Sequence, residues 1–63
     1  MEYDLPIVGA RYKKGCQVKH VIDIMFKKEG HPDIIYLVPG KNRMSGQWYP
    51  LWADWVRDAT RLE

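Results

Sequence analysis

The sequence predicts a mainly β fold, with four or five short antiparallel strands and a short C-terminal helix. Glycine and proline recur at short intervals and divide the chain into pieces of strand length. Several of these pieces are rich in β-branched and aromatic residues, which favour strands. A chain of 63 residues has room for one domain with a small core, assigned here to residues 1–61. Leu62 and Glu63 are interpreted as a possible expression-tag remnant.

Residues 33–38 form the clearest predicted strand, because they are mainly β-branched or aromatic and lie between two Gly/Pro breaks. Residues 7–12 alternate loosely and lead into Lys13-Lys14-Gly15, which predicts a first hairpin. Residues 47–49 predict a brief further strand. Pro50 suits the first turn of a helix, and residues 51–61 carry apolar side chains at helical spacing. Within this helix we expect Trp55 to anchor the core.

Residues 16–28 fit two structures. As a strand they separate loosely into two faces, and as a helix they gather Val18, Val21, Ile22, Ile24, Met25 and Phe26 on one arc. We favour the strand, because β-branched residues lose side-chain freedom in a helix and Gly15-Cys16-Gln17 offers no N-cap. The strand would then pair with residues 33–38. The alternative is an α+β fold with a helix at residues 16–29.

Short strands, a long second strand, basic hairpins and a closing helical turn together resemble a small SH3-like barrel. The segments that carry the resemblance are Gly9-Ala10-Arg11-Tyr12 and residues 18–24, 35–38 and 52–59. They are similar to small uncharacterised proteins of phage, prophage and plasmid genomes. This resemblance implies no assigned catalytic or binding residue, and a fold of this kind does not determine function.

The sequence argues against several classes of function. No apolar run is long enough to cross a bilayer, and the acidic N-terminus does not suit a signal peptide, so we expect no membrane contact and a cytoplasmic location. Cys16 is the only cysteine, which agrees with a reducing compartment. On a strand, Cys16 and His20 lie too far apart to share a metal ion or to act as nucleophile and base. We therefore expect a non-enzymatic binding module with no metal and no cofactor.

Positive charge collects in the predicted turns. Between residues 11 and 43 there is a local excess of cations over acids, although the net charge of the whole chain is only +2. If successive hairpins opened toward the same end, they would form one basic rim suited to the phosphates of DNA or RNA. The candidate nucleic-acid-binding residues are Lys13, Lys14, Lys27, Lys28, Lys41 and Arg43.

Aromatic residues collect in the C-terminal third of the chain. Three Trp and their neighbouring Tyr residues cannot all be buried in so small a domain, so an aromatic surface patch is expected. The candidate protein-binding residues are Trp48, Tyr49 and Trp52. Interaction with a protein partner or self-association through this patch is the first functional hypothesis. Nucleic-acid binding through the basic hairpins is the alternative, and the sequence leaves both open.

Overall fold

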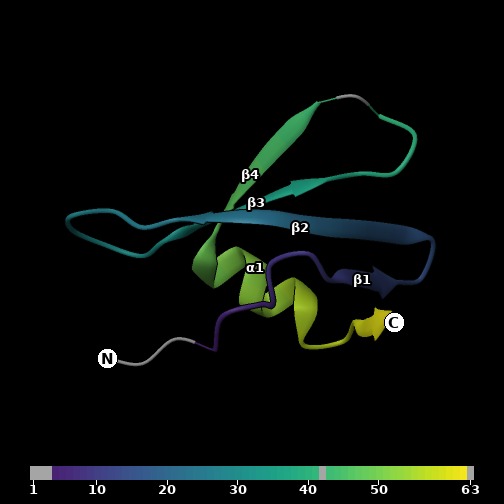
Figure 1. Cartoon of the computed structure of the whole chain (residues 1–63). Helices are drawn as coiled ribbons and strands as arrows, with labels where there is room; N and C mark the ends of the chain where they lie inside the picture. Colours follow the sequence, from purple (N-terminus) through teal and green to yellow (C-terminus); the bar gives the residue numbers. More distant parts are fainter. Residues whose placement is uncertain (1–3, 42, 63) are drawn as a thin grey trace.

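The computed structural model describes residues 4–41 and 43–62. Within these residues, five strands form one antiparallel sheet in the order β4-β3-β2-β1-β5, and one helix precedes the last strand (Figure 1). The predicted fold class, mainly β with a short helix near the C-terminus, is therefore confirmed. The elements are β1 (Arg11–Lys14), β2 (Gln17–Met25), β3 (Asp33–Leu37), β4 (Met44–Trp48), α1 (Tyr49–Val56) and β5 (Thr60–Leu62).

The segment that fitted both a strand and a helix is the long central strand β2. It pairs with β3 in antiparallel register, with Ile24 opposite Ile34, and the register shifts between Val21 and Asp23. A bulge at this point bends the strand and increases its twist. The helical alternative for residues 16–29 is wrong, because the β-branched side chains of this segment pack on both faces of a sheet instead of along one helical face.

Several predicted boundaries differ from the structure. The hairpin strand begins at Arg11 rather than at residue 7, and β4 begins at Met44 rather than at residue 47. The helix α1 covers residues 49–56 rather than 51–61. Residues 60–62 form β5 because they pair with β1, with Thr60 opposite Lys13. Leu62, which the sequence separates from the domain, lies within this strand, whereas residue 63 lies outside the described part of the chain.

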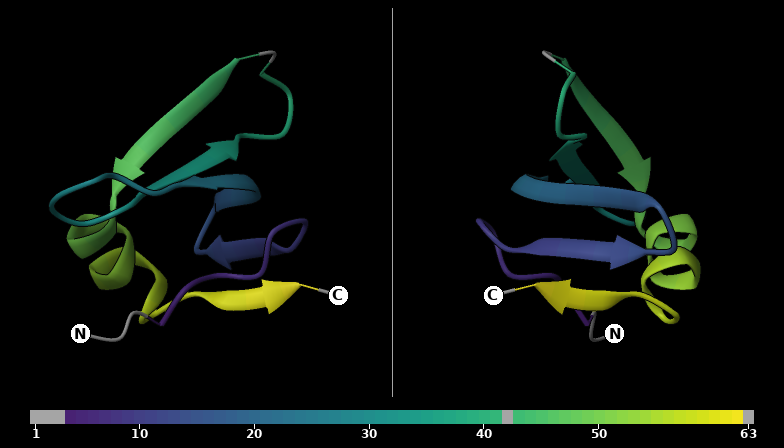
Figure 2. Two further views of the ribbon diagram at one scale, coloured as in Figure 1. Left: turned by 60° about the vertical axis from the view of Figure 1, so that its left-hand side comes forward. Right: turned by 90° about the vertical axis from the view of Figure 1, so that its right-hand side faces the viewer.

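The core lies between the sheet and α1, on the face of the sheet that we call the inner face (Figure 2). Its buried hydrophobic side chains are Tyr12, Val21, Ile34 and Trp52. The Trp52 ring meets the Tyr12 ring edge-on, with centroids 5.5 Å apart. Trp55 is partly buried and packs against this cluster, so it borders the core as the sequence predicts, but the fully buried ring is that of Trp52. Helical spacing places both Trp52 and Trp55 toward the sheet, but only the Trp52 ring is fully buried there.

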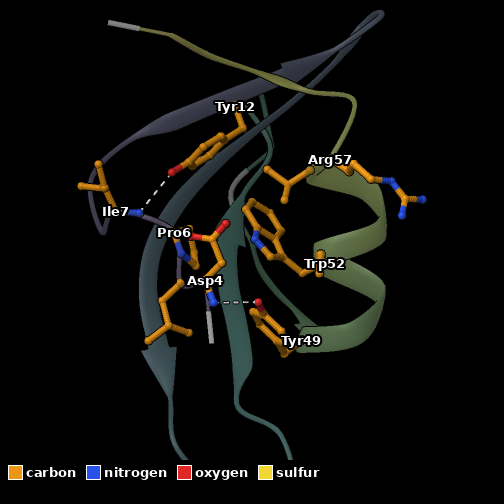
Figure 3. A pocket seen from close by; sticks show the side chains of 10 residues that line it. Asp4, Pro6, Ile7, Tyr12, Tyr49, Trp52 and Arg57 are labelled. Carbon is orange, nitrogen blue, oxygen red and sulfur yellow. Dashed lines mark hydrogen bonds between the residues drawn. The ribbon is translucent and has the colours of Figure 1, made fainter. Parts of the chain in front are cut away.

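The chain before β1 crosses the core beside α1. The backbone N–H of Asp4 donates to the Tyr49 hydroxyl at 2.9 Å, and that of Ile7 donates to the Tyr12 hydroxyl at 3.1 Å (Figure 3). Between this segment and α1 lies a hollow of about 660 Å³. The two tyrosines therefore hold the N-terminal segment against the core.

Candidate functional site

The candidate site is the part of the inner face that extends beyond the core toward the β1–β2 turn. Strand register places these side chains together, because residues opposite one another in a sheet share a face. Lys14 lies opposite Gln17, Tyr12 lies opposite Lys19, and Tyr36 lies opposite Ser45. We call this surface the basic inner face and define it by Lys14, Gln17, Lys19, Tyr36, Ser45 and Gln47, with Trp55 of α1 at its border.

Lys19 occupies the middle of the basic inner face. Its Nζ atom lies 4.2 Å from the centroid of the Trp55 ring and 4.8 Å from that of Tyr36. The same ammonium group donates to Gln47 Oε1 at 2.7 Å. These contacts combine cation–π attraction with a hydrogen bond to a neutral acceptor. They fix the position of the charge without neutralising it.

A second polar contact joins α1 to the start of β2. The indole Nε1 of Trp55 donates to Gln17 Oε1 at 2.8 Å. One side chain of α1 therefore contributes both the ring that faces Lys19 and a hydrogen bond to the sheet. Both the helix and the sheet therefore contribute contacts that position Lys19.

The electrostatic environment of Lys19 favours an added negative charge. Partial burial lowers the pKa of Lys19 below its ordinary value, and the positive charge of Lys14 lowers the pKa further. Desolvation and repulsion by a like charge both disfavour the protonated ammonium. An anion placed beside Lys19 would stabilise the ammonium against both effects.

The β3–β4 hairpin extends the basic inner face into a hollow. The hollow measures about 640 Å³ and is lined by Tyr36, Val38, Lys41, Arg43 and Ser45. The hairpin turns at Gly40, whose φ of 89° lies in the left-handed region that glycine adopts readily. The exposed cations Lys41 and Arg43 therefore flank a partly exposed tyrosine ring.

Acidic side chains are absent from the inward positions of the described strands. The two acidic strand residues, Asp23 and Asp33, lie opposite Ile35 and Trp48 on the other face of the sheet, which we call the outer face. Asp33 also pairs there with Lys27 at 3.2 Å. The strands therefore separate charge by face, which the small net charge of the chain conceals.

The structure divides the six cations that the sequence selected. Lys14, Lys41 and Arg43 accompany the basic inner face, whereas Lys13 lies on the outer face of β1, since it pairs one position beyond the inward Tyr12. Lys27 and Lys28 follow β2 at the opposite end of the sheet (Figure 1). The predicted single basic rim is wrong, because consecutive hairpins of an antiparallel sheet open at alternate ends.

The sequence missed the residues at the centre of this site. The sequence pattern places Lys19 on a strand face without selecting it for the site, and it indicates only a strand position for Tyr36. One signal was available, since a lysine in register with a buried tyrosine lies on the core side of a sheet. That signal depends on the pairing of β1 with β2, which is clear only once the turn at Gly15-Cys16 is placed.

The predicted aromatic patch is also only partly correct. Trp48 is 48% exposed on the outer face, and its ring lies edge-on to His31 with centroids 5.3 Å apart. Tyr49 is half-buried and accepts the hydrogen bond from Asp4. Trp52 is 0% exposed and cannot contribute to a surface patch, because its ring fills the core beneath α1. Of the three predicted residues, Trp48 is the main exposed aromatic.

The hollow beside the N-terminal segment has a different character from the basic inner face. Tyr12, Tyr49 and Trp52 line it from β1 and α1 (Figure 3). Arg57 at its border forms an ion pair with Asp54, so its charge is already partnered. This hollow offers less to an anion than the surface around Lys19.

Metal binding, cysteine chemistry and membrane insertion each have little support in the described residues. Within residues 4–41 and 43–62, no three His, Cys, Asp or Glu side chains gather closely enough to hold a metal ion. Cys16 is exposed in the β1–β2 turn, outside the strand that carries His20. In the same part of the chain, no helix has the length and apolar character needed to cross a membrane.

Comparison with known proteins gives no family for this chain. No protein-family model matches it, and neither the curated proteins nor the solved structures contain a significant match. The resemblance to small phage and plasmid proteins stays a prediction. Function is therefore inferred from the geometry and charge of the inner face.

Proposed function

We propose that this chain is a non-enzymatic module that binds single-stranded nucleic acid on its basic inner face. The observation that carries the proposal is Lys19, a charged group held between two aromatic rings on a face whose described strands carry no inward carboxylate. Proteins that bind single strands combine cations for the phosphates with aromatic rings on which bases stack. The proposal includes a cytoplasmic location, because a single cysteine agrees with a reducing compartment.

The geometry suggests a role for each part of the site. Lys19, Lys41 and Arg43 contact phosphates, and a base enters the hollow to stack on Tyr36. Backbone charge and stacking are features that every sequence offers, so binding depends only weakly on sequence. Single strands fit better than a duplex, because stacking requires a base that is not already paired.

A charge-reversal experiment tests the proposal. The probe is a fluorescently labelled oligothymidylate or oligouridylate, whose binding is followed by anisotropy at about 50 mM salt and then at rising salt. The parent chain should bind with a log affinity that falls linearly with log salt. In Lys41→Glu/Arg43→Glu the affinity should fall by about tenfold or more. Its salt slope should flatten by about 1.4, at roughly 0.7 for each phosphate of a single strand that is no longer neutralised.

A matched variant controls for net charge. Lys13→Glu/Lys28→Glu reverses two exposed cations, one on the outer face and one at the opposite end of the sheet. It changes the net charge by the same amount, so a general electrostatic attraction would weaken equally in both variants. The proposal requires a much smaller effect in this control. Equal decreases in the two variants, or a parent chain that does not bind at low salt, would show that the basic inner face is only a solvated surface.

A further inference from the structure

The two edge strands of the sheet differ in how they discourage pairing with another strand. β5 has only three residues and carries Arg61. β4 has five residues, Met-Ser-Gly-Gln-Trp, with no charge and no proline. Soluble sheet proteins usually protect an edge with charges, proline, a bulge or a very short strand. β4, the outermost strand in Figures 1 and 2, has none of these features.

The backbone groups that β4 leaves available follow from its pairing with β3. The N–H of Tyr49 donates to the carbonyl of Pro32 at 3.0 Å, so position 49 is a hydrogen-bonded position of this ladder. Hydrogen-bonded and non-hydrogen-bonded positions alternate along an antiparallel pair. The N–H and C=O groups of Met44 and Gly46 and the N–H of Trp48 therefore point away from β3, toward the free edge. The C=O of Trp48, the N-cap residue of α1, accepts the first hydrogen bond of the helix instead.

These free groups match a second copy of the same strand. If two β4 strands pair antiparallel about Gly46, then Gly46 faces Gly46 and Met44 faces Trp48 of the other copy. This register aligns the whole strand. The two Gly46 residues exchange both backbone hydrogen bonds, and the N–H of Trp48 donates to the C=O of Met44 in the other copy. It also places Ser45 opposite Gln47 of the other copy, on the inner face.

The side chains near the edge suit such a contact. Met44 is 68% exposed and Trp48 is 48% exposed, and both lie on the outer face. Ile35 of β3 reaches over Gly46, since a Cβ at position 46 would lie 3.3 Å from Ile35 Cδ1. In the paired form, Met44 and Trp48 of each copy bury each other on the outer face on both sides of the central glycine. Cross-strand pairs of an aromatic and an aliphatic side chain stabilise antiparallel sheets.

We propose that β4 is a self-association edge, through which two copies of this chain form a two-fold dimer with one continuous sheet. The partner is a second copy because the strand, paired with itself about its central residue Gly46, is aligned over its full length. An isologous contact of this kind uses the same surface on both subunits. The contact is small, so the dimer should be weak and should depend on concentration. The proposal is independent of nucleic-acid binding.

Sedimentation of the parent chain between about 10 μM and 1 mM tests association itself, because weak dimers have dissociation constants in this range. The average mass should rise from that of a monomer toward that of a dimer. The variant Met44→Glu/Trp48→Glu should keep the mass of a monomer, because the proposed register places the new carboxylates opposite each other. A parent chain that remains monomeric at about 1 mM would overturn the proposal, as would a glutamate variant that is folded and still dimeric.

Disulfide trapping tests the register. In a Cys16→Ser background, Ser45→Cys and Gln47→Cys are prepared as separate chains and mixed under mild oxidation. The register places these positions opposite each other at a non-hydrogen-bonded pair, within reach of a disulfide. The mixture should cross-link, and neither chain alone should. A mixture of Thr60→Cys and Leu62→Cys at the β5 edge is the matched control. Equal cross-linking at both edges, or with Ser45→Cys alone, would contradict the proposal.

Discussion

The two faces of the sheet use similar residue types for different purposes. On the inner face, aromatic rings pack into the core or surround a lysine, and the described strands contribute no carboxylate. On the outer face, both acidic strand residues are present and Met25, Met44 and Trp48 are exposed. A chain with almost balanced charge can therefore present one cationic face and one face that combines charges of both signs with exposed apolar side chains. The net charge alone would have given no reason to expect this.

The most damaging change should come from the inner face beneath α1. Trp52→Ala removes a ring with 0% exposure and should reduce the free energy of unfolding by about 3 to 5 kcal/mol. In a domain of this size, that decrease can abolish folding. Trp48→Ala on the outer face should cost no more than about 1 kcal/mol, because half of that ring already contacts water. Urea denaturation followed by circular dichroism compares the two variants.

Equal destabilisation in these two variants would contradict the assignment of the core. The comparison is informative because both substitutions remove the same type of side chain from neighbouring parts of the chain. Trp52 Nε1 has no hydrogen-bond partner in the described residues, so its contribution is mainly packing. An intact, cooperative melt of Trp52→Ala near the parent temperature would show that the core lies elsewhere.

Local sequence patterns were sufficient for the strands but not for the ends of the fold. The β-branched runs predicted β2 and β3, since such residues favour a pleated surface wherever the strand lies. The helical spacing of residues 51–61 did not reveal that the chain turns at Arg57 and Asp58. β5 exists because β1 offers it a pairing edge, with Arg61 opposite Tyr12. A three-residue strand is specified by that distant partner and not by its own composition.

The candidate site was less predictable than the fold for a related reason. Cations in turns are visible in a sequence, and Lys41 and Arg43 are found in this way. Lys19 is not, because its place depends on register across three strands and on the helix that carries Trp55. The alternation of hairpin ends also removes Lys27 and Lys28 from the site. Composition reveals charge, whereas topology decides which charges meet.

A smaller effect should show that the aromatic residues of the two faces contribute differently to oligonucleotide binding. Tyr36→Leu removes the ring that lines the hollow between Lys41 and Arg43. Loss of a ring on which one base stacks costs about 1 to 3 kcal/mol of binding free energy, so the affinity for the labelled oligonucleotide should fall by roughly 5-fold to 150-fold. Trp48→Leu removes a larger ring from the outer face and should leave the affinity unchanged. Anisotropy at one fixed low salt concentration measures both variants.

Thermal melts accompany this comparison, because Tyr36 is partly buried. The affinity is interpreted only at temperatures where both variants are folded. If Trp48→Leu weakens binding as much as Tyr36→Leu does, then the outer face takes part in binding and the distinction between the faces disappears. The same result would make Trp48 the principal aromatic residue of the binding surface.

The smallest expected effect on stability, and the most specific one, concerns Lys19. Lys19→Met keeps an unbranched side chain between Tyr36 and Trp55 but removes the charge. The variant lacks the cation–π attraction and the hydrogen bond to Gln47, and it no longer buries an ammonium beside Lys14. These effects oppose each other, so the stability at neutral pH should stay within about 1 kcal/mol of the parent. Oligonucleotide affinity should nevertheless fall, because the methionine cannot neutralise a phosphate.

The pH dependence of stability, compared between the parent and Lys19→Met, tests whether the Lys19 ammonium is partly buried. The pKa of Lys19 in the folded chain lies below the ordinary lysine value of 10.5, because of partial burial and, to a lesser extent, the charge of Lys14. Below the folded-state pKa, both states hold the proton and the full cost of the buried charge is present. Between that pKa and 10.5, the unfolded chain holds more of the proton, so raising the pH favours the folded state. Denaturation from about pH 8 upward should therefore show the parent gaining stability relative to Lys19→Met. A constant difference, or a relative decrease for the parent, would mean that Lys19 is fully solvated and does not occupy the space between the two rings.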